Sequence, residues 1–462
     1  MSGSTCPGDR AAAYRTLVER TAPACAEAVD DREIAAVLES DGITDAVARN
    51  RYGSSDVFAL AERLCRDTPR HPRPPAEVTS PWRPTPHLHL LRGLLFALPA
   101  LVYLAVANVI SGFRGAVVLV ASVLLSWAVS QGLAYLGYRR LGCADPAGAG
   151  RILRGGLLWA TLPTVAGTVG LGLALRVPWA VVVVAVAQVT YLVAATVALV
   201  LGRERWLLVA LAPGVGAAVT GLVAGGGLVR SLPFVACAAT SVLGAVVVAW
   251  SATRGARPGL PSTAELIDAS PNAMFGVGVG GLLLFVPAVR SFHPAPDAAI
   301  GAGVALAILL SLSMSMGAAE WLLYAYRAAM HRALQRSYTL GAFGRRAAAA
   351  LLAAVGAYLA ALLVAAAGAG AVVAARTDHD LPLMPLAGAA TLGGALFVAL
   401  LLMSFGDRLP VVAACFLALA LDGLLLNRGT PPEQIQVTTS ATLLAALLVY
   451  AVTTLRHATR HQ

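Results

Sequence analysis

Two carboxylates stand inside long apolar runs of this sequence, and they are the residues best placed to do chemistry. Glu320 lies about two helical turns from one end of its run, and Asp422 lies about one turn from the end of another. Burying a charge in lipid costs at least a few kcal/mol, so each should face protein or water. Glu320 is interpreted as a proton carrier, or alternatively as the structural partner of a nearby arginine such as Arg327 or Arg139. Asp422 is interpreted as lining an external vestibule, or alternatively as simply reaching water.

Motifs of enzymes and metal sites are scarce. The sequence has no Walker loop, HExxH, nucleophile elbow or DxD, and the predicted loop at Ser111–Arg114 carries no carboxylate. Asp378-His379-Asp380 could chelate a cation, although a solvated turn is the simpler interpretation. His87-x-His89 lacks a third ligand, so these rings, with Trp82, are expected at the membrane interface. The six cysteines show no CxxC spacing and are expected to be small buried hydrophobes. We therefore predict no enzyme, no cofactor and no metal site.

These candidates must be positioned by apolar segments, of which the sequence has twelve. A span needs about 20 mostly apolar residues. The runs lack period-2 alternation, so they are predicted to be helices and the fold class to be all-α, a polytopic membrane protein. Hydrophobic residues make up 58% of the chain and charged residues only 13%, with a mean hydropathy of +0.74. The predicted spans are 90–111, 114–137, 154–175, 177–201, 206–228, 231–250, 273–290, 297–326, 347–375, 381–404, 409–426 and 437–455.

The basic residues predict the orientation of these spans. The chain has no lysine, and its net charge of +10 belongs to the membrane part, because the region before it is close to neutral. This argues against a nucleic-acid partner. With a cytoplasmic N-terminus, the positive-inside rule is met by sixteen arginines against six. The sixteen on the cytoplasmic side are Arg139, Arg140, Arg151, Arg154, Arg203, Arg205, Arg254, Arg257, Arg327, Arg332, Arg336, Arg345, Arg346, Arg408, Arg456 and Arg460. The six on the outside are Arg114, Arg176, Arg230, Arg290, Arg376 and Arg428.

Residues 1–68 are predicted to form a separate cytoplasmic helical unit, joined by a Pro-rich linker, 69–89. The polar start lacks the features of a cleavable signal peptide. About 60 residues is marginal for an independent core, so the unit is expected to dock on the membrane part or on a partner. Helices are predicted at Ala11–Ala28, Asp31–Glu39, Asp45–Arg51 (ended by Gly53) and Asp56–Arg66 (capped by Ser55, with Val57, Phe58, Leu60 and Leu64 on one side).

A faint repeat divides the membrane part into halves at 90–250 and 273–455, with a cytoplasmic connection at 251–272 and a tail at 456–462. Gly93–Pro99 resembles Gly281–Pro287, and Tyr138-Arg139 resembles Tyr326-Arg327, both at an offset of 188 residues. Six spans separate the members of each pair, which predicts parallel halves. Pro99, Pro287 and the glycines of the seventh span are interpreted either as loosening these helices or as letting them pack closely.

The two halves, the loosened first and seventh spans, and the endings Gln131–Arg140 and Glu320–Arg327 resemble the multidrug/oligosaccharidyl-lipid/polysaccharide exporter superfamily. That group includes polysaccharide and lipid-linked-sugar flippases. The resemblance covers roughly residues 90–455. The stretch Asp41–Gly53 and the all-arginine usage also resemble uncharacterised membrane proteins of high-GC actinobacteria. The signature of major facilitators is absent from Leu141–Arg151.

Two functions remain open. The first is an alternating-access exporter or flippase for a lipid-linked or polymeric cell-envelope saccharide, in which cytoplasmic arginines gather an anionic head group. The second is a non-transporting scaffold of an envelope-assembly or division complex. Expected partners are membrane lipids, such a saccharide, and envelope-biosynthesis proteins bound through residues 1–68. The repeat favours the transporter, and the few charges in the spans favour the scaffold. The candidate transport residues are Glu320, Arg139, Arg327, Asp422, Pro99 and Pro287.

Overall fold

The computed structural model describes residues 7–28, 30–68, 86–106, 112–223, 232–292, 298–336, 339–377 and 382–457. Contacts divide the chain into two compact units, Met1–Ser80 and Pro81–Gln462. Every regular element in the described ranges is a helix, which confirms the predicted all-α class. The predicted linker at 69–89 falls largely outside the described residues, and so does Asp378-His379-Asp380.

The N-terminal unit is a small helical cluster with its own apolar core. Leu17, Ile34, Leu38, Leu60 and Leu64 are all almost completely buried. They come from different helices, so the core depends on all of the elements folding together. These elements are α1 (Pro7–Glu27), α2 (Asp31–Ser40), α3 (Asp45–Val47) with the π-helical turn η1 (Ala48–Tyr52), and α4 (Val57–Asp67).

Two details of this unit differ from the prediction. The cap of α4 is Asp56, not Ser55: its carboxylate accepts the Ala59 amide at 2.8 Å, and this bond holds the pKa of Asp56 below its usual value. Phe58 is 57% exposed instead of lying with Val57 on the buried side. Position 58 follows the buried position directly, and one helical step turns a side chain by about 100°.

The stretch that joins α2 to α4 is organised by local polar contacts. Asp45 accepts the Val57 amide at 3.0 Å, and Arg49 donates to the Ser55 carbonyl at 3.0 Å. Gly53 ends η1 with φ of 70°, in the left-handed region that glycine adopts without strain. The end of the third predicted helix at Gly53 is therefore confirmed.

The second unit contains the membrane helices. Among the described residues, ten helical segments are long and apolar enough to cross a membrane, so the chain is a multi-pass membrane protein. The other two predicted spans, 90–111 and 206–228, fall on α5 and α10 and run past them into residues that are not described. The elements are α5 (Pro86–Val106), α6 (Phe113–Gly142), α7 (Pro146–Gly155), η3 (Gly156–Ala160), α8 (Thr161–Ala174), α9 (Trp179–Val200), α10 (Glu204–Val223), α11 (Leu232–Ala252), α12 (Thr263–Phe292), α13 (Ala298–Arg336), α14 (Leu340–Thr377), α15 (Leu383–Ser404), α16 (Arg408–Asn427) and α17 (Pro432–Leu455).

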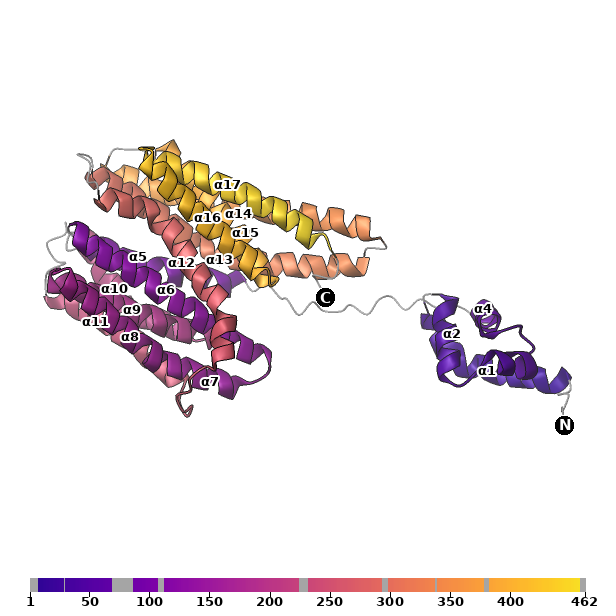
Figure 1. The fold of residues 1–462 in the computed structure, drawn as a ribbon. Coiled ribbons are helices and arrows are strands. Elements are labelled where there is room, and N and C mark those ends of the chain that lie inside the picture. The colour runs from indigo at the N-terminus through magenta and orange to yellow at the C-terminus, as the bar shows by residue number, and fades with distance from the viewer. Residues whose placement is uncertain are drawn as a thin grey trace. The chain divides into compact units, whose positions relative to one another are not determined.

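These helices form two halves with matching contacts, α5–α11 and α12–α17 (Figure 1). In the first half α9 packs on α6, α8 and α11, and in the second α15 packs on α13, α14 and α17. The same shift of six spans relates the contact of α5 with α10 to that of α12 with α16. It also relates the contact of α10 with α11 to that of α16 with α17. The halves contact each other through two pairs of helices: α5 packs on α13, and α12 packs on α6. This correspondence agrees with the predicted parallel repeat, span 1 on span 7 and span 2 on span 8.

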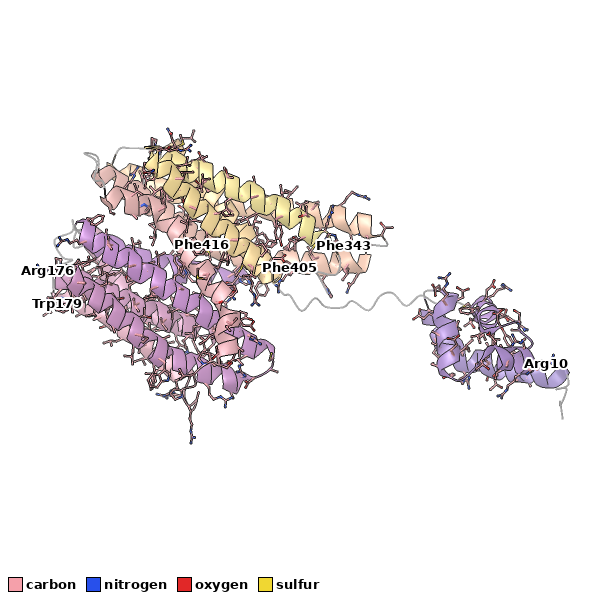
Figure 2. All side chains as sticks on the ribbon, in the orientation of Figure 1. Arg10, Arg176, Trp179, Phe343, Phe405 and Phe416 are labelled. Atoms are coloured by element: carbon pink, nitrogen blue, oxygen red, sulfur yellow. The ribbon has the colours of Figure 1, made fainter. Side chains whose placement is uncertain are left out.

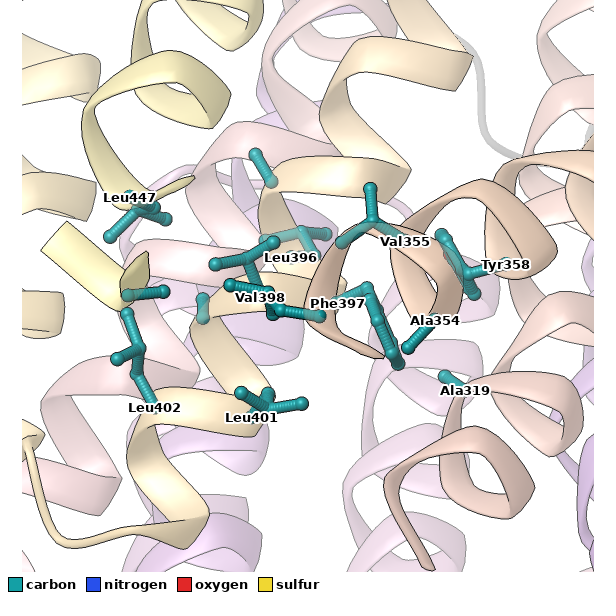
Figure 3. Packing of buried hydrophobic residues seen from close by; sticks show 14 of the residues in the cluster. Ala319, Ala354, Val355, Tyr358, Leu396, Phe397, Val398, Leu401, Leu402 and Leu447 are labelled. Atoms are coloured by element: carbon teal, nitrogen blue, oxygen red, sulfur yellow. The ribbon is translucent and has the colours of Figure 1, made fainter. Parts of the chain in front are cut away.

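The equivalent helices α9 and α15 are the most buried of the ten candidate spans. Phe397 of α15 stacks on Tyr358 of α14, with ring centroids 4.9 Å apart (Figure 3). Leu401 and Leu402 are fully buried on different sides of the same helix. A helix that is apolar all round is stable only when protein or lipid surrounds it, and here it is largely protein.

The glycines of α12 support the close-packing interpretation over the loosening one. A Cβ on Gly276 would lie 3.0 Å from the Trp127 carbonyl of α6, and one on Gly278 would lie 2.9 Å from Cys415 of α16. Glycines therefore admit a neighbouring helix on both sides of α12. The helix also continues through Pro287, as α5 continues through Pro99.

Candidate functional site

The contact between α5 and α13 joins the first half to the second, and we call it the seam. A Cβ on Gly93 of α5 would lie 2.9 Å from the Met314 carbonyl, and one on Gly317 of α13 would lie 3.0 Å from the Cα of Gly93. The two backbones touch because both residues lack side chains. This close approach brings the polar residues on the next turns of α5 and α13 together.

Beside the glycines lies an ionic cluster that draws on three helices. Arg92 of α5 donates from Nε and Nη2 to Glu204 Oε1 of α10, at 3.0 and 2.6 Å. The remaining terminal nitrogen of the same guanidinium, Nη1, is paired with Glu320 Oε1 of α13. One arginine therefore bridges a carboxylate of its own half and a carboxylate of the other half. The five donors of a guanidinium suit this double role.

His89 completes this group, and we call the four residues His89, Arg92, Glu204 and Glu320 the seam cluster. His89 is only 5% exposed. Its Nδ1 lies 3.5 Å from Glu320 Oε2, and its ring lies 5.1 Å from the ring of Tyr324. The expectation that His89 anchors the chain at the lipid interface is therefore wrong. The ring is buried because helix α13 covers it.

Other polar contacts link the halves at the same face. Arg139 of α6 pairs with Asp268 of α12 at 2.5 Å, and Arg140 pairs with Glu265. Arg408 of α16 donates to the Asp268 carbonyl and stands 4.3 Å over the Tyr135 ring. This face holds the ends of α5, α6, α10, α12, α13 and α16 that were predicted to be cytoplasmic. Of the ion pairs between described residues, all those that join the halves lie here.

The opposite face has an ion pair of a different kind. Arg290 at the end of α12 donates from Nε to Glu433 Oε1 of α17 at 2.8 Å, and both helices belong to the second half. Figure 2 shows Arg176 and Trp179 at this end of the molecule and Phe343 and Phe405 toward the other. The described ion pairs thus lock the halves together at the predicted cytoplasmic face alone.

The structure separates Glu320 from the two arginines expected to act with it. Glu320 does pair with an arginine, as the structural alternative expected, but the arginine is Arg92 and not Arg327 or Arg139, which were named as examples. Arg139 is bound to Asp268, and Arg327 donates to the Ser404 carbonyl and lies 5.1 Å from the Phe405 ring. The physical reason is distance: Arg327 is seven residues beyond Glu320, which is about 10 Å along the helix axis, whereas Arg92 comes from α5, which packs directly on α13.

Asp422 lies on α16 in the outer part of the second half and is only 3% exposed. The Thr439 hydroxyl of α17 is buried beside this carboxylate. In this conformation Asp422 reaches neither water nor an open vestibule, because α17 packs on α16 and the side chain is buried.

The cysteines and the residues that could bind a metal ion are the remaining candidates. Cys25 and Cys415 are buried as expected, whereas Cys143 is exposed at the end of α6. The described residues contain no group of histidine, cysteine, aspartate and glutamate side chains that could hold a metal ion. Nothing in the described ranges therefore points to metal chemistry.

Arg92 and Glu204 are the site residues that sequence reasoning missed. Arg92 is the one arginine within the first predicted span, and this position was a signal that it needs a partner. Glu204 stands between Arg203 and Arg205, so it looks like part of an ordinary charged loop. It is buried because α10 begins there and turns Glu204 toward α5 while its neighbours stay exposed.

No protein-family model matches the chain, and no curated protein matches it in sequence. Solved structures do match its fold. A MATE in complex with Br-NRF has a TM-score of 0.51 at 13% identity, over 80% of this chain and 94% of that one. The outward-facing conformation of a multidrug resistance MATE family transporter of the MOP superfamily has a TM-score of 0.50 at 14% identity, over 82% and 99%. A MATE P26A mutant gives 0.50 at 12% identity, over 81% and 98%.

Nearly the whole length of these proteins is covered, while the identity is too low to carry their activity across. The two matched halves, and the helices through which they contact each other, all belong to the second unit of the chain. The membrane unit of this chain therefore has the fold of the MATE family transporters of the MOP superfamily, as the superfamily resemblance in its sequence predicted.

Proposed function

We propose that this protein is an alternating-access transporter that exports or flips a lipid-linked or polymeric cell-envelope saccharide. The observation that carries the proposal is the one-sided linkage of the halves. Ion pairs join them at the predicted cytoplasmic face, and the described ion pair at the other face stays within one half. Two rigid bundles held at one face can exchange access by breaking those contacts and forming others.

The basic end of the second half supports an anionic substrate. Residues 321–377 contain no aspartate or glutamate. Arg332, Arg345 and Arg456 are exposed at the ends of α13, α14 and α17, and Arg456 packs against Gly344 of α14. Positive charge at this face would attract the phosphate or pyrophosphate of a lipid-linked sugar before it enters between the halves.

A transport assay in proteoliposomes tests the proposal. The substrate is a pyrophosphate-linked lipid saccharide carrying an NBD group, and dithionite bleaches only the label in the outer leaflet. The protein should make the inner-leaflet label accessible, whereas empty liposomes should keep it protected. If the label stays protected with and without a pH gradient, this saccharide class is excluded.

The scaffold is the second candidate, and the N-terminal unit favours it. That unit has a core of its own, so it could present a docking surface independently of transport. A scaffold would keep its partners when the seam contacts are broken, whereas a transporter would lose export. Affinity purification of the full chain with Glu320→Gln, compared with the unsubstituted chain, separates the two functions.

A further inference from the structure

The charges of the seam cluster do not balance. Arg92 supplies one positive charge, while Glu204 and Glu320 supply two negative charges. Their side chains are 23%, 10% and 25% exposed, so solvent compensates only part of the excess. A partly buried group of charges is costly unless its charges are paired. The cluster therefore needs one more positive charge.

The described side chains of the surrounding helices offer no cation that could supply this charge. Tyr138 of α6 and Tyr324 of α13 face the cluster, and a tyrosine carries no positive charge in either protonation state. Glu204 is flanked in the sequence by Arg203 and Arg205, and both of these arginines are exposed. The nearest arginine of α6, Arg139, is bound to Asp268. Among the described residues, only His89 of α5 stands beside the excess carboxylate and can change its charge.

His89 is placed to hold the missing charge as a proton. Its two ring nitrogens are buried and have no hydrogen-bond partner in the described structure, and Nδ1 faces Glu320 Oε2 at 3.5 Å. A proton on the ring would give Glu320 a charge-assisted hydrogen bond after a small approach. We propose that the seam cluster binds one exchangeable proton, between His89 and Glu320, and that this proton is coupled to opening of the predicted cytoplasmic face.

The coupling follows from which half carries each residue, and it rests on the proposed transport function. His89, Arg92 and Glu204 belong to the first half, and Glu320 belongs to the second. When the seam opens, Arg92 and Glu204 remain a balanced pair, while His89 and Glu320 separate into water. The closed seam therefore holds the proton more strongly than the open one. By linkage, falling pH favours the closed seam and rising pH favours opening.

Distance measurements across the seam test this without a substrate. Spin labels are placed on native Cys143 of α6 and on Gln335→Cys of α13, both exposed at the predicted cytoplasmic face. The other five cysteines are replaced by alanine in the full chain, which is studied in lipid nanodiscs. The ratio of short to long distances should rise as pH falls from about 9 to about 5, by up to about tenfold per pH unit for one linked proton.

Three variants locate the proton. Glu320→Gln balances the cluster without a proton, so the ratio should no longer depend on pH. His89→Gln removes the proton's site and should have the same result, which keeps the test valid if either variant accumulates poorly. Glu433→Gln removes a carboxylate from the balanced pair at the other face and should leave the pH dependence unchanged.

Each other outcome has a definite meaning. Two distance populations whose ratio is independent of pH would overturn the proton site and leave alternating access intact. A pH dependence that survives both Glu320→Gln and His89→Gln would place the proton elsewhere and overturn the proposal. A single population at every pH would overturn both this proposal and the proposed transport mechanism.

Discussion

The seam cluster and the Arg290–Glu433 pair are both arginine–carboxylate contacts between membrane helices, yet they differ in charge and in what they join. Arg290 has one carboxylate and ties two helices of the same half. Arg92 has two carboxylates and ties one half to the other. The first can serve as a static brace, because nothing in it must separate when the halves move. The second lies where separation would occur, and its charge state depends on a proton.

The face on which each contact lies is the first thing to establish. Arg345→Cys, in the first turns of α14, should be protected from an impermeant maleimide in intact cells. Arg428→Cys, in the connection between α16 and α17, should be labelled. The expected difference is all or none, since the arginine distribution predicts opposite sides. Labelling of Arg345→Cys from outside would reverse the topology and put the seam cluster on the outer face.

Loss of the Glu320 charge should have the next largest effect. Glu320→Gln keeps the shape of the side chain and removes the negative charge that pairs with Arg92 of the other half. Export should fall by about 5- to 150-fold, the range typical of lost coupling between sites, while the amount of protein in the membrane stays normal. Glu433→Gln is the matched control and should export normally. Normal export by Glu320→Gln would make the residue structural and favour the scaffold.

Removing the arginines compares the two contacts by stability. Arg92→Gln leaves two carboxylates in a group that is mostly buried, and we expect a loss of about 2–4 kcal/mol in the free energy of unfolding. Arg290→Gln leaves one carboxylate in a more exposed pair and should cost about 1 kcal/mol or less. Unfolding in mixed micelles by titration with dodecyl sulfate measures both. Equal losses would show that the charge excess of the seam cluster has no energetic consequence.

The glycine contact of the seam gives the smallest predicted effect. Gly317→Ala places a methyl group against the His89 carbonyl, so α5 and α13 must move apart at a cost of about 1–3 kcal/mol. Gly356→Ala on α14 meets no atom within 4 Å and should leave stability unchanged or raise it by less than about 1 kcal/mol. The same titration measures both. If the two variants behave alike, the close approach at Gly317 is not needed for packing.

Several features of the fold were predictable because they depend on local composition. Span 114–137 became α6 and span 409–426 became α16 with small changes at the ends. Apolar length and loop charge are properties of neighbouring residues, so the sequence reveals them directly. The N-terminal helices were predictable for the same reason, with an error at Ser55 where two adjacent residues could both serve as the cap.

The candidate site was predicted only in part. Glu320 stood out because a carboxylate in an apolar run must have a partner. Its partner did not, since Arg92 is 228 residues away in the sequence and belongs to the other half. Tyr138-Arg139 and Tyr326-Arg327 show the same limit: Tyr138 is 49% exposed and Tyr326 is 2% exposed. Equivalent positions in a repeat can have different neighbours.

The sequence by itself determined that this is a many-spanning helical membrane protein, with a separate N-terminal unit and a six-span repeat. Those properties follow from hydrophobicity, charge and periodicity along the chain. Only the tertiary structure decided that α5 packs on α13 and α12 on α6, and so which charges meet. Glycines without side chains allow these helices to approach closely, and the approach brings together the charged residues that the helices carry. The excess negative charge of Glu320, beside His89, is a consequence of this packing alone.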